Sequence, residues 1–294
     1  MSGRPQAGAL LELLKPVTWF PPMWAFLCGA VSSGAPLAGR WSLVMLGILV
    51  TGPMVCGASQ VVNDWFDRDV DRLNEPQRPI PSGRVPGRLG LVFAVAWSLL
   101  SLALGAVLGP LGFVATGLAL VSAWAYSAPP VRLKANGWWG NLAVALSYEG
   151  LAWVCGAAVL VGGTTLPVPI LALALLYSLG AHGIMTLNDF KSVAGDRVSG
   201  VRSLPVQLGV AGAARTACAI MIAAQLAVIA LEWRWGLVRP ALVVTALVAV
   251  QLVMMRHFLR DVRARALWYS ALGVPVYVSG MMVSAVGLRA LGAA

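Results

Sequence analysis

Three aspartates at the end of a hydrophobic stretch have the spacing of one helix face. The segment "NDWFDRDVD" supplies Asp64, Asp67 and Asp71. They occupy positions i, i+3 and i+7, and residues so spaced project from the same side of an α-helix. Asp69 follows Asp67 by two residues, or about 200° of rotation, and is excluded from the group. Three carboxylates on one face could together bind a cation.

A second segment repeats this pattern later in the chain. "NDFKSVAGDR" (188–197) aligns with "NDWFDRDVDR" (63–72) at one constant offset. The aligned pairs are Asn63 with Asn188, Asp64 with Asp189, Asp67 with Ser192, and Asp71 with Asp196. Both segments follow a hydrophobic run. The alignment therefore indicates an internal repeat of two similar helical halves, each with an acidic helix end.

Together the two segments predict a magnesium site. Five carboxylates in one place would repel one another unless cations lay between them. Mg²⁺ prefers carboxylate oxygens, retains water and completes its coordination shell with substrate phosphates. The alternative is that these are solvated acids paired with Arg68, Arg72 and Arg197. The metal site is favoured because one spacing recurs in a chain whose only aspartate outside these segments is Asp261.

Basic and polar residues in three loops could bind a diphosphate beside such a metal. Arg78 lies in "NEPQRPIPSG", where the prolines restrict the backbone. "YSAPPVRLKANG" and the second acidic segment supply Tyr126, Arg132, Lys134 and Lys191. Each charge taken alone could instead serve only to set membrane topology. Lys191 in particular points away from the acidic face unless the helix frays there.

Two polar residues inside hydrophobic runs are weaker candidates for binding a substrate. Glu149, in "ALSYEGLAW", would be costly in lipid and is expected to face a cavity. His182 precedes Asn188 by six residues, on the helix face that leads towards the acids. A hydrogen-bonded core histidine is the preferred interpretation of His182. The alternative is a ligand to the substrate, or to a metal that the substrate carries.

The elements that must position these residues are membrane helices. The chain is 59% hydrophobic and 11% charged, whereas soluble domains are about 25% charged. No tract alternates like the strands of a membrane barrel. The chain is therefore expected to be an all-α, polytopic membrane protein, a single domain over residues 1–294 in one bundle with two pseudo-repeated halves. About nine runs approach the length of a membrane span: 18–36, 41–62, 89–108, 111–127, 138–162, 167–187, 211–231, 237–256 and 267–288.

The basic residues predict the orientation of the chain. The net charge is +10, and the chain has 21 Lys and Arg. Most of these lie in the N-terminal segment, in the loops after every second run, or at the near edge of the run that follows such a loop. The exceptions are Arg40, Arg234, Arg239 and Arg289. By the positive-inside rule the N-terminus is cytoplasmic and the C-terminus lies outside. Charge distributed in this way favours anionic lipid and anionic substrates over nucleic acid.

The remaining features are simpler. Residues 1–16 lack the pattern of a signal peptide and are expected to form a helix or tail at the membrane surface. The four cysteines stand singly in hydrophobic runs, so packing is favoured over disulfides or metal binding. They are Cys28, Cys56, Cys155 and Cys218.

The acidic segments resemble those of a known family. "NDWFDRDVD" resembles the NDxxDxxxD motif of the UbiA superfamily of intramembrane prenyltransferases, and residues 189–196 resemble its second aspartate motif. The longer strings "VNDWFDRDVDRLNEPQRPIPSGR", "YSAPPVRLKANGWWGN" and "HGIMTLNDFKSVAGDR" resemble the branch of chlorophyll and bacteriochlorophyll synthases. "RPIPSGRVPGR" favours the bacterial members of that branch.

This resemblance implies a nine-helix bundle in a bacterial inner membrane, with its active site open to the cytoplasm. A geranylgeranyl or phytyl group would pass from its diphosphate to the propionate of (bacterio)chlorophyllide. The five aspartates would hold Mg²⁺, with Asn63 and Asn188 in support. Many relatives have a third aspartate where this chain has Ser192. Pigment-assembly proteins are candidate partners, but no motif indicates them.

Two other functions remain open. A sibling enzyme would prenylate an aromatic quinone precursor or haem. An ion-coupled transporter would carry its acids near mid-membrane on broken helices. Here the acids lie at helix ends beside basic loops, which favours the transferase.

Overall fold

The computed structural model describes residues 7–292, and these are almost entirely helical. Within that range there is no β-strand, only one isolated bridge between Asn136 and Arg202. The short helices of the N-terminal part are α1 (Ala7–Leu13), the 3₁₀ turn η1 (Pro16–Thr18) and α2 (Phe20–Ser32). The all-α prediction is confirmed.

The remaining helices, most of them long, follow in chain order. Two long helices are interrupted by π-helical segments, η2 and η4. The bounds are α3 (Trp41–Leu49), η2 (Val50–Cys56), α4 (Gly57–Asn74), α5 (Leu89–Val107), α6 (Pro110–Ser127), η3 (Leu133–Ala135), α7 (Gly137–Ala145), η4 (Leu146–Leu151), α8 (Ala152–Val161), α9 (Val168–Asp189), α10 (Val193–Ser199), α11 (Leu204–Arg234), α12 (Val238–Arg260) and α13 (Val262–Gly292).

Eight helices in the described range are long and apolar enough to span a membrane. The chain is a multi-pass membrane protein. The first predicted run, 18–36, forms only the 13-residue helix α2. The second is longer than predicted, because the helix that begins at Trp41 continues through the whole first acidic segment to Asn74.

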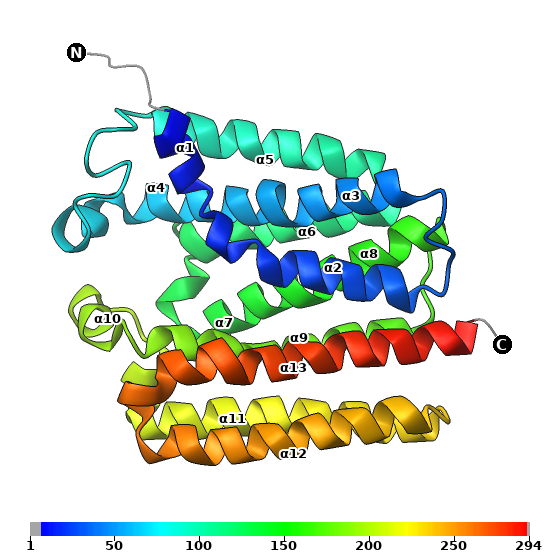
Figure 1. Cartoon of the computed structure of the whole chain (residues 1–294). Coiled ribbons are helices and arrows are strands. Elements are labelled where there is room, and N and C mark those ends of the chain that lie inside the picture. Colours follow the sequence, from blue (N-terminus) through cyan, green and yellow to red (C-terminus); the bar gives the residue numbers. More distant parts are fainter. Residues whose placement is uncertain (1–6, 293–294) are drawn as a thin grey trace.

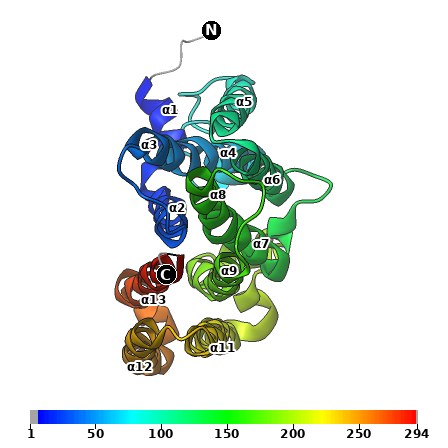
Figure 2. The ribbon, with the colours of Figure 1, turned by 90° about the vertical axis from the view of Figure 1, so that its right-hand side faces the viewer.

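The helices lie roughly side by side, and the loops gather at the two ends of the bundle (Figure 1). Helix α1, the loop after α4 and helix α10 lie at one end, and the last turns of α13 lie at the other. Seen along the helices, α8 lies near the centre, with α2, α6 and α9 around it (Figure 2). The two acidic segments therefore share one end of the bundle.

Glycine allows a close crossing between α2 and α8. A Cβ atom at Gly29 would collide with the backbone of Trp153, and one at Gly156 would collide with the backbone of Phe26. Small residues at such positions let membrane helices approach closely, where packing replaces the hydrophobic driving force. This crossing fixes α8 beside the cavities described below.

Candidate active site

Helix α4 presents its aspartates as the spacing predicted. Asp64 and Asp71 are buried, with 2% and 7% of their surface exposed. Asp67 lines a cavity of about 240 Å³ at the end of the bundle. Asp69 lies apart from this group, exposed and 3.6 Å from both Arg68 and Arg72. Its exclusion from the site agrees with the structure.

The second acidic segment reaches the same cavity. Asp189 is the last residue of α9, and Asp196 lies in the short helix α10. Ser192 precedes α10 and donates a hydrogen bond to Asp196 Oδ2 at 3.0 Å. Four of the five predicted aspartates line this cavity, together with other polar residues; the lining includes Asn63, Asp67, Asp71, Tyr126, Arg132, Lys134, Asn141, Asp189, Ser192 and Asp196.

Arg78 binds the acids of α4 from the loop that follows that helix. Its Nη1 atom lies 2.9 Å from Asp71 Oδ2 and 3.4 Å from Asp64 Oδ1, and its Nε atom contacts Glu75. One guanidinium thus joins two buried carboxylates. Both aspartate contacts are made by Nη1, and Arg78 itself is not among the residues that line the acidic cavity.

Lys134 and Arg132 approach Asp67 from the loop between α6 and α7. Lys134 Nζ lies 2.6 Å from Asp67 Oδ1, and Arg132 Nη2 lies 3.9 Å from the same atom. Burial lowers the pKa of Lys134, and the attraction of Asp67 opposes that effect. Arg132 has a φ of 38°, a left-handed conformation that is strained for a residue with a side chain. The loop thus directs both cations into the cavity.

Two polar residues of the site were not predicted from the sequence. Lys15 Nζ lies 2.6 Å from Asp64 Oδ1, although the first 16 residues were expected to be only a surface helix or tail. Asn141 donates a hydrogen bond to Asp189 Oδ2 at 3.2 Å and lines the cavity. The signal for Asn141 was present, because it is a polar residue inside a hydrophobic run, like Glu149.

Some predicted site residues lie elsewhere. Lys191 is exposed and is not part of the cavity lining. His182 is buried, with Nε2 3.2 Å from the carbonyl oxygen of Trp138 and Nδ1 without a partner among the described residues. Glu149 was expected to face a cavity, but it lines neither the acidic cavity nor the larger one described below. It is buried, and its electrostatic neighbours include Cys28 and Tyr277.

The donor atoms fit a hard divalent cation. Within residues 7–292, no three carboxylate, imidazole or thiol groups are already arranged around one point. Mg²⁺ does not need such a cage, because it binds through one or two carboxylates, water and phosphate oxygens. Asp189 offers a carboxylate that receives a hydrogen bond from Asn141 and has no cation in contact among the described residues.

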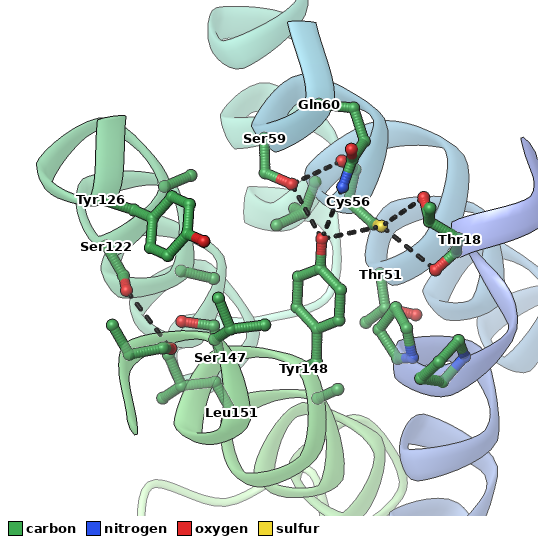
Figure 3. A pocket seen from close by; sticks show the side chains of 18 of the residues that line it. Thr18, Thr51, Cys56, Ser59, Gln60, Ser122, Tyr126, Ser147, Tyr148 and Leu151 are labelled. Atoms are coloured by element: carbon green, nitrogen blue, oxygen red, sulfur yellow. Dashed lines mark hydrogen bonds between the residues drawn. The ribbon is translucent and has the colours of Figure 1, made fainter. Parts of the chain in front are cut away.

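A second, larger cavity of about 440 Å³ adjoins the first, and Figure 3 shows side chains that line it. The two share the lining residues Asn63, Tyr126, Asn141 and Asp189. Asn188 lines the larger cavity only. A molecule in the larger cavity would therefore have direct access to the acids, while most of it lay between helices.

The comparisons with known proteins agree with this geometry. The chain is 55% identical to the bacteriochlorophyll synthase 33 kDa chain of Cereibacter sphaeroides, over 98% of this chain and 95% of that protein. It is 40% identical to the chloroplastic chlorophyll synthase of Avena sativa, over 94% of this chain and 75% of that protein.

Solved structures share the fold. A UbiA homologue from Archaeoglobus fulgidus bound to DMAPP and Mg²⁺ superposes with a TM-score of 0.66 at 20% identity, over 96% of this chain and 99% of that one. A family model, the UbiA prenyltransferase family, matches residues 18–279. The chain belongs to the UbiA prenyltransferase family.

Proposed function

We propose that this enzyme transfers a geranylgeranyl or phytyl group from its diphosphate to the propionate carboxylate of (bacterio)chlorophyllide, forming the esterified pigment. The observation that carries the proposal is the meeting of two acidic segments at one cavity, with the cationic side chains of Arg78, Arg132 and Lys134 in contact with the aspartates. The named relatives are chlorophyll and bacteriochlorophyll synthases, which supports a pigment as the acceptor.

The aspartates would hold Mg²⁺, and the basic residues would bind the diphosphate. The candidate metal ligands are Asp64, Asp67, Asp71, Asp189 and Asp196. A bound Mg²⁺ supplies positive charge that stabilises the departing diphosphate. Arg78, Arg132 and Lys134 would bind the diphosphate oxygens that remain. Asn63, Asn188 and Tyr126 line the same space and would orient the substrate by hydrogen bonds.

The acceptor needs little activation. A propionate is ionised at neutral pH, so it can attack the allylic carbon without a general base. Water must be excluded, because it would compete for the same carbon and release free prenol. The lining of the larger cavity includes Val55, Ala115, Ala119, Val144 and Leu151, which would provide such an environment.

The proposal includes an orientation in a bacterial inner membrane. The end of α4 and helix α10, which carry aspartates of the acidic cavity, lie at the same end of the bundle as α1 (Figure 1), and the basic residues concentrate in loops predicted to be cytoplasmic. Both substrates would then bind from the cytoplasmic side. The prenyl tail would remain in contact with helices or lipid.

The test is a transfer assay with membranes that contain the protein. Mg²⁺ is supplied with one prenyl diphosphate, geranylgeranyl or phytyl, and one acceptor, which is chlorophyllide, bacteriochlorophyllide or an aromatic acid. The expected product is a pigment ester, measured by chromatography of the extracted pigment. Prenylation of the aromatic acid in place of both pigments would overturn the proposed acceptor. No transfer to any acceptor, from membranes in which the protein is inserted and folded, would overturn the proposed activity.

A further inference from the structure

Four polar residues form a connected group on one wall of the larger cavity. We call them the Tyr148 cluster: Cys56, Ser59, Gln60 and Tyr148 (Figure 3). The Tyr148 hydroxyl oxygen lies 3.0 Å from Ser59 Oγ, 3.0 Å from Gln60 Nε2 and 3.2 Å from Cys56 Sγ. The cluster joins α4 and its preceding segment to η4, deeper in the bundle than the acids.

Both π-helical segments of the described chain meet at this cluster. Cys56 ends η2, and Tyr148 lies in η4. A π-helical turn accommodates one extra residue at the expense of helix stability, and such turns occur frequently at functional sites. Two of them at one contact indicate that the cavity wall has been shaped for a ligand and not only for packing.

The hydrogen bonds in and beside the cluster leave some polar groups without a partner in the described part of the chain, and these could bind that ligand. Ser59 donates to the carbonyl oxygen of Cys56 at 2.7 Å, so Tyr148 donates to Ser59 and accepts from Gln60. A glutamine amide has two N–H donors and one acceptor oxygen, and only one N–H of Gln60 is used. Ser147 Oγ also lines the cavity, is buried and has no partner among the described residues. Two donors are therefore available to oxygen atoms.

An isoprenoid tail does not suit this wall. It has no atom that accepts a hydrogen bond, and burying a donor without a partner is unfavourable. A neighbouring groove shares Ser147 with the cavity, but most of its lining is apolar and includes Trp139, Leu142, Leu146, Val154 and Leu171. Hydrocarbon can lie in that groove without covering Gln60.

We propose that the larger cavity is the acceptor site, and that Gln60 and Ser147, which lie on different sides of it (Figure 3), select the acceptor by donating hydrogen bonds to carbonyl oxygens on its ring. Tyr148 is a positioning residue that holds the amide of Gln60. The inference rests on the proposed function. Gln60 lies seven residues before Asp67 on α4, or about 10 Å along the helix. A tetrapyrrole can cover that span with its propionate towards the acids and a ring carbonyl towards Gln60.

The test compares Gln60→Met and Ser147→Ala with the unaltered enzyme in membranes. For each, KM is measured separately for the pigment and for the prenyl diphosphate. Each variant is expected to raise the KM of bacteriochlorophyllide about five- to tenfold, the effect of losing one hydrogen bond, and to leave the KM of the prenyl diphosphate within twofold. Ser279→Ala removes a similar hydroxyl from an exposed position on α13 and should change neither.

Two acceptors identify which carbonyl is bound. Bacteriochlorophyllide carries an acetyl group where chlorophyllide carries a vinyl group, and both carry a ring ketone. A loss confined to bacteriochlorophyllide assigns the acetyl group, and a loss with both pigments assigns the ketone. An unchanged pigment KM in both variants, or a raised KM for the prenyl diphosphate instead, would overturn the inference while the transferase activity itself stood. If the unaltered enzyme esterified neither pigment, the proposed function would fail first.

Discussion

Lys15 Nζ lies 2.6 Å from Asp64 Oδ1, across 49 residues of chain. The pair links the segment after α1 to the first acidic motif. Asp64 is buried, and its remaining cation, Arg78, is 3.4 Å away and shared with Asp71. Lys15 is therefore the main charge partner of this carboxylate among the described residues when no metal is bound.

Lys15→Met is expected to lower stability mainly without metal. Removing one partner of a buried ion pair leaves an uncompensated charge, here at a cost of about 1–2 kcal/mol because Lys15 is partly exposed and Arg78 remains. A bound Mg²⁺ would restore the missing charge and stabilise the folded state. The measurement is thermal unfolding of the purified protein in EDTA and in Mg²⁺.

The matched control is Arg84→Met, because Arg84 holds Glu12 of α1 but contacts none of the five aspartates. Its effect on the unfolding temperature should be equal in EDTA and in Mg²⁺. If Lys15→Met behaved in the same way, the idea that a cation reaches Asp64 would be wrong.

Asp189→Asn and Asp69→Asn make a second matched pair. Asp189 lines both cavities, so the loss of its charge is expected to reduce the rate of ester formation about 100-fold or more. Asp69 is exposed, and its ion-pair partners among the described residues are Arg68 and Arg72, so its variant should keep at least about half of the activity. The measurement is the transfer assay at saturating Mg²⁺. Equal rates for the two variants would remove Asp189 from the site.

The first acidic motif shows how much of the site periodicity alone can predict. Asp64, Asp67 and Asp71 lie on a continuous helix, and the 3.6-residue period placed them on one face. The meeting with Asp189 depended on tertiary structure. It was predictable only because the same spacing occurs twice. Successive membrane helices run in opposite directions, and this brings the two acidic helix ends to one end of the bundle.

Glu149 shows where an argument from polarity alone fails. Its cost in lipid predicted that it faces a cavity, but it lies in the π-helical turn Leu146–Leu151. The extra residue changes which side chains face the cavity. Ser147, Tyr148 and Leu151 line it, whereas Glu149 is buried against other helices. Lys15 was missed for a different reason: its partner is 49 residues away, and no local pattern reports such a contact.

Lys134 and Lys191 were both expected to bind diphosphate, and the structure separates them. Lys134 lines the acidic cavity beside Asp67, whereas Lys191 is exposed. Lys134→Met is expected to raise the KM of the prenyl diphosphate about tenfold or more, the effect of losing a hydrogen bond from a charged group. Lys191→Met should change it less than about threefold. Both KM values are measured at fixed pigment concentration. A larger increase in KM for Lys191→Met than for Lys134→Met would show that the turn before α10 moves Lys191 into the site when substrate binds.

Ser192 is the position where the two acidic segments differ, because its counterpart in the first segment is Asp67. The serine lines the cavity and already donates to Asp196. Ser192→Asp would replace that donor by a second carboxylate near Asp196, and more ligand charge strengthens the binding of a divalent cation. The Mg²⁺ concentration that gives half-maximal activity is therefore expected to fall about three- to tenfold. Ser192→Asn, which has nearly the same size without the charge, is the control and should not lower it. If Ser192→Asp raised the Mg²⁺ requirement, the cation would lie away from α10, with the acids of α4.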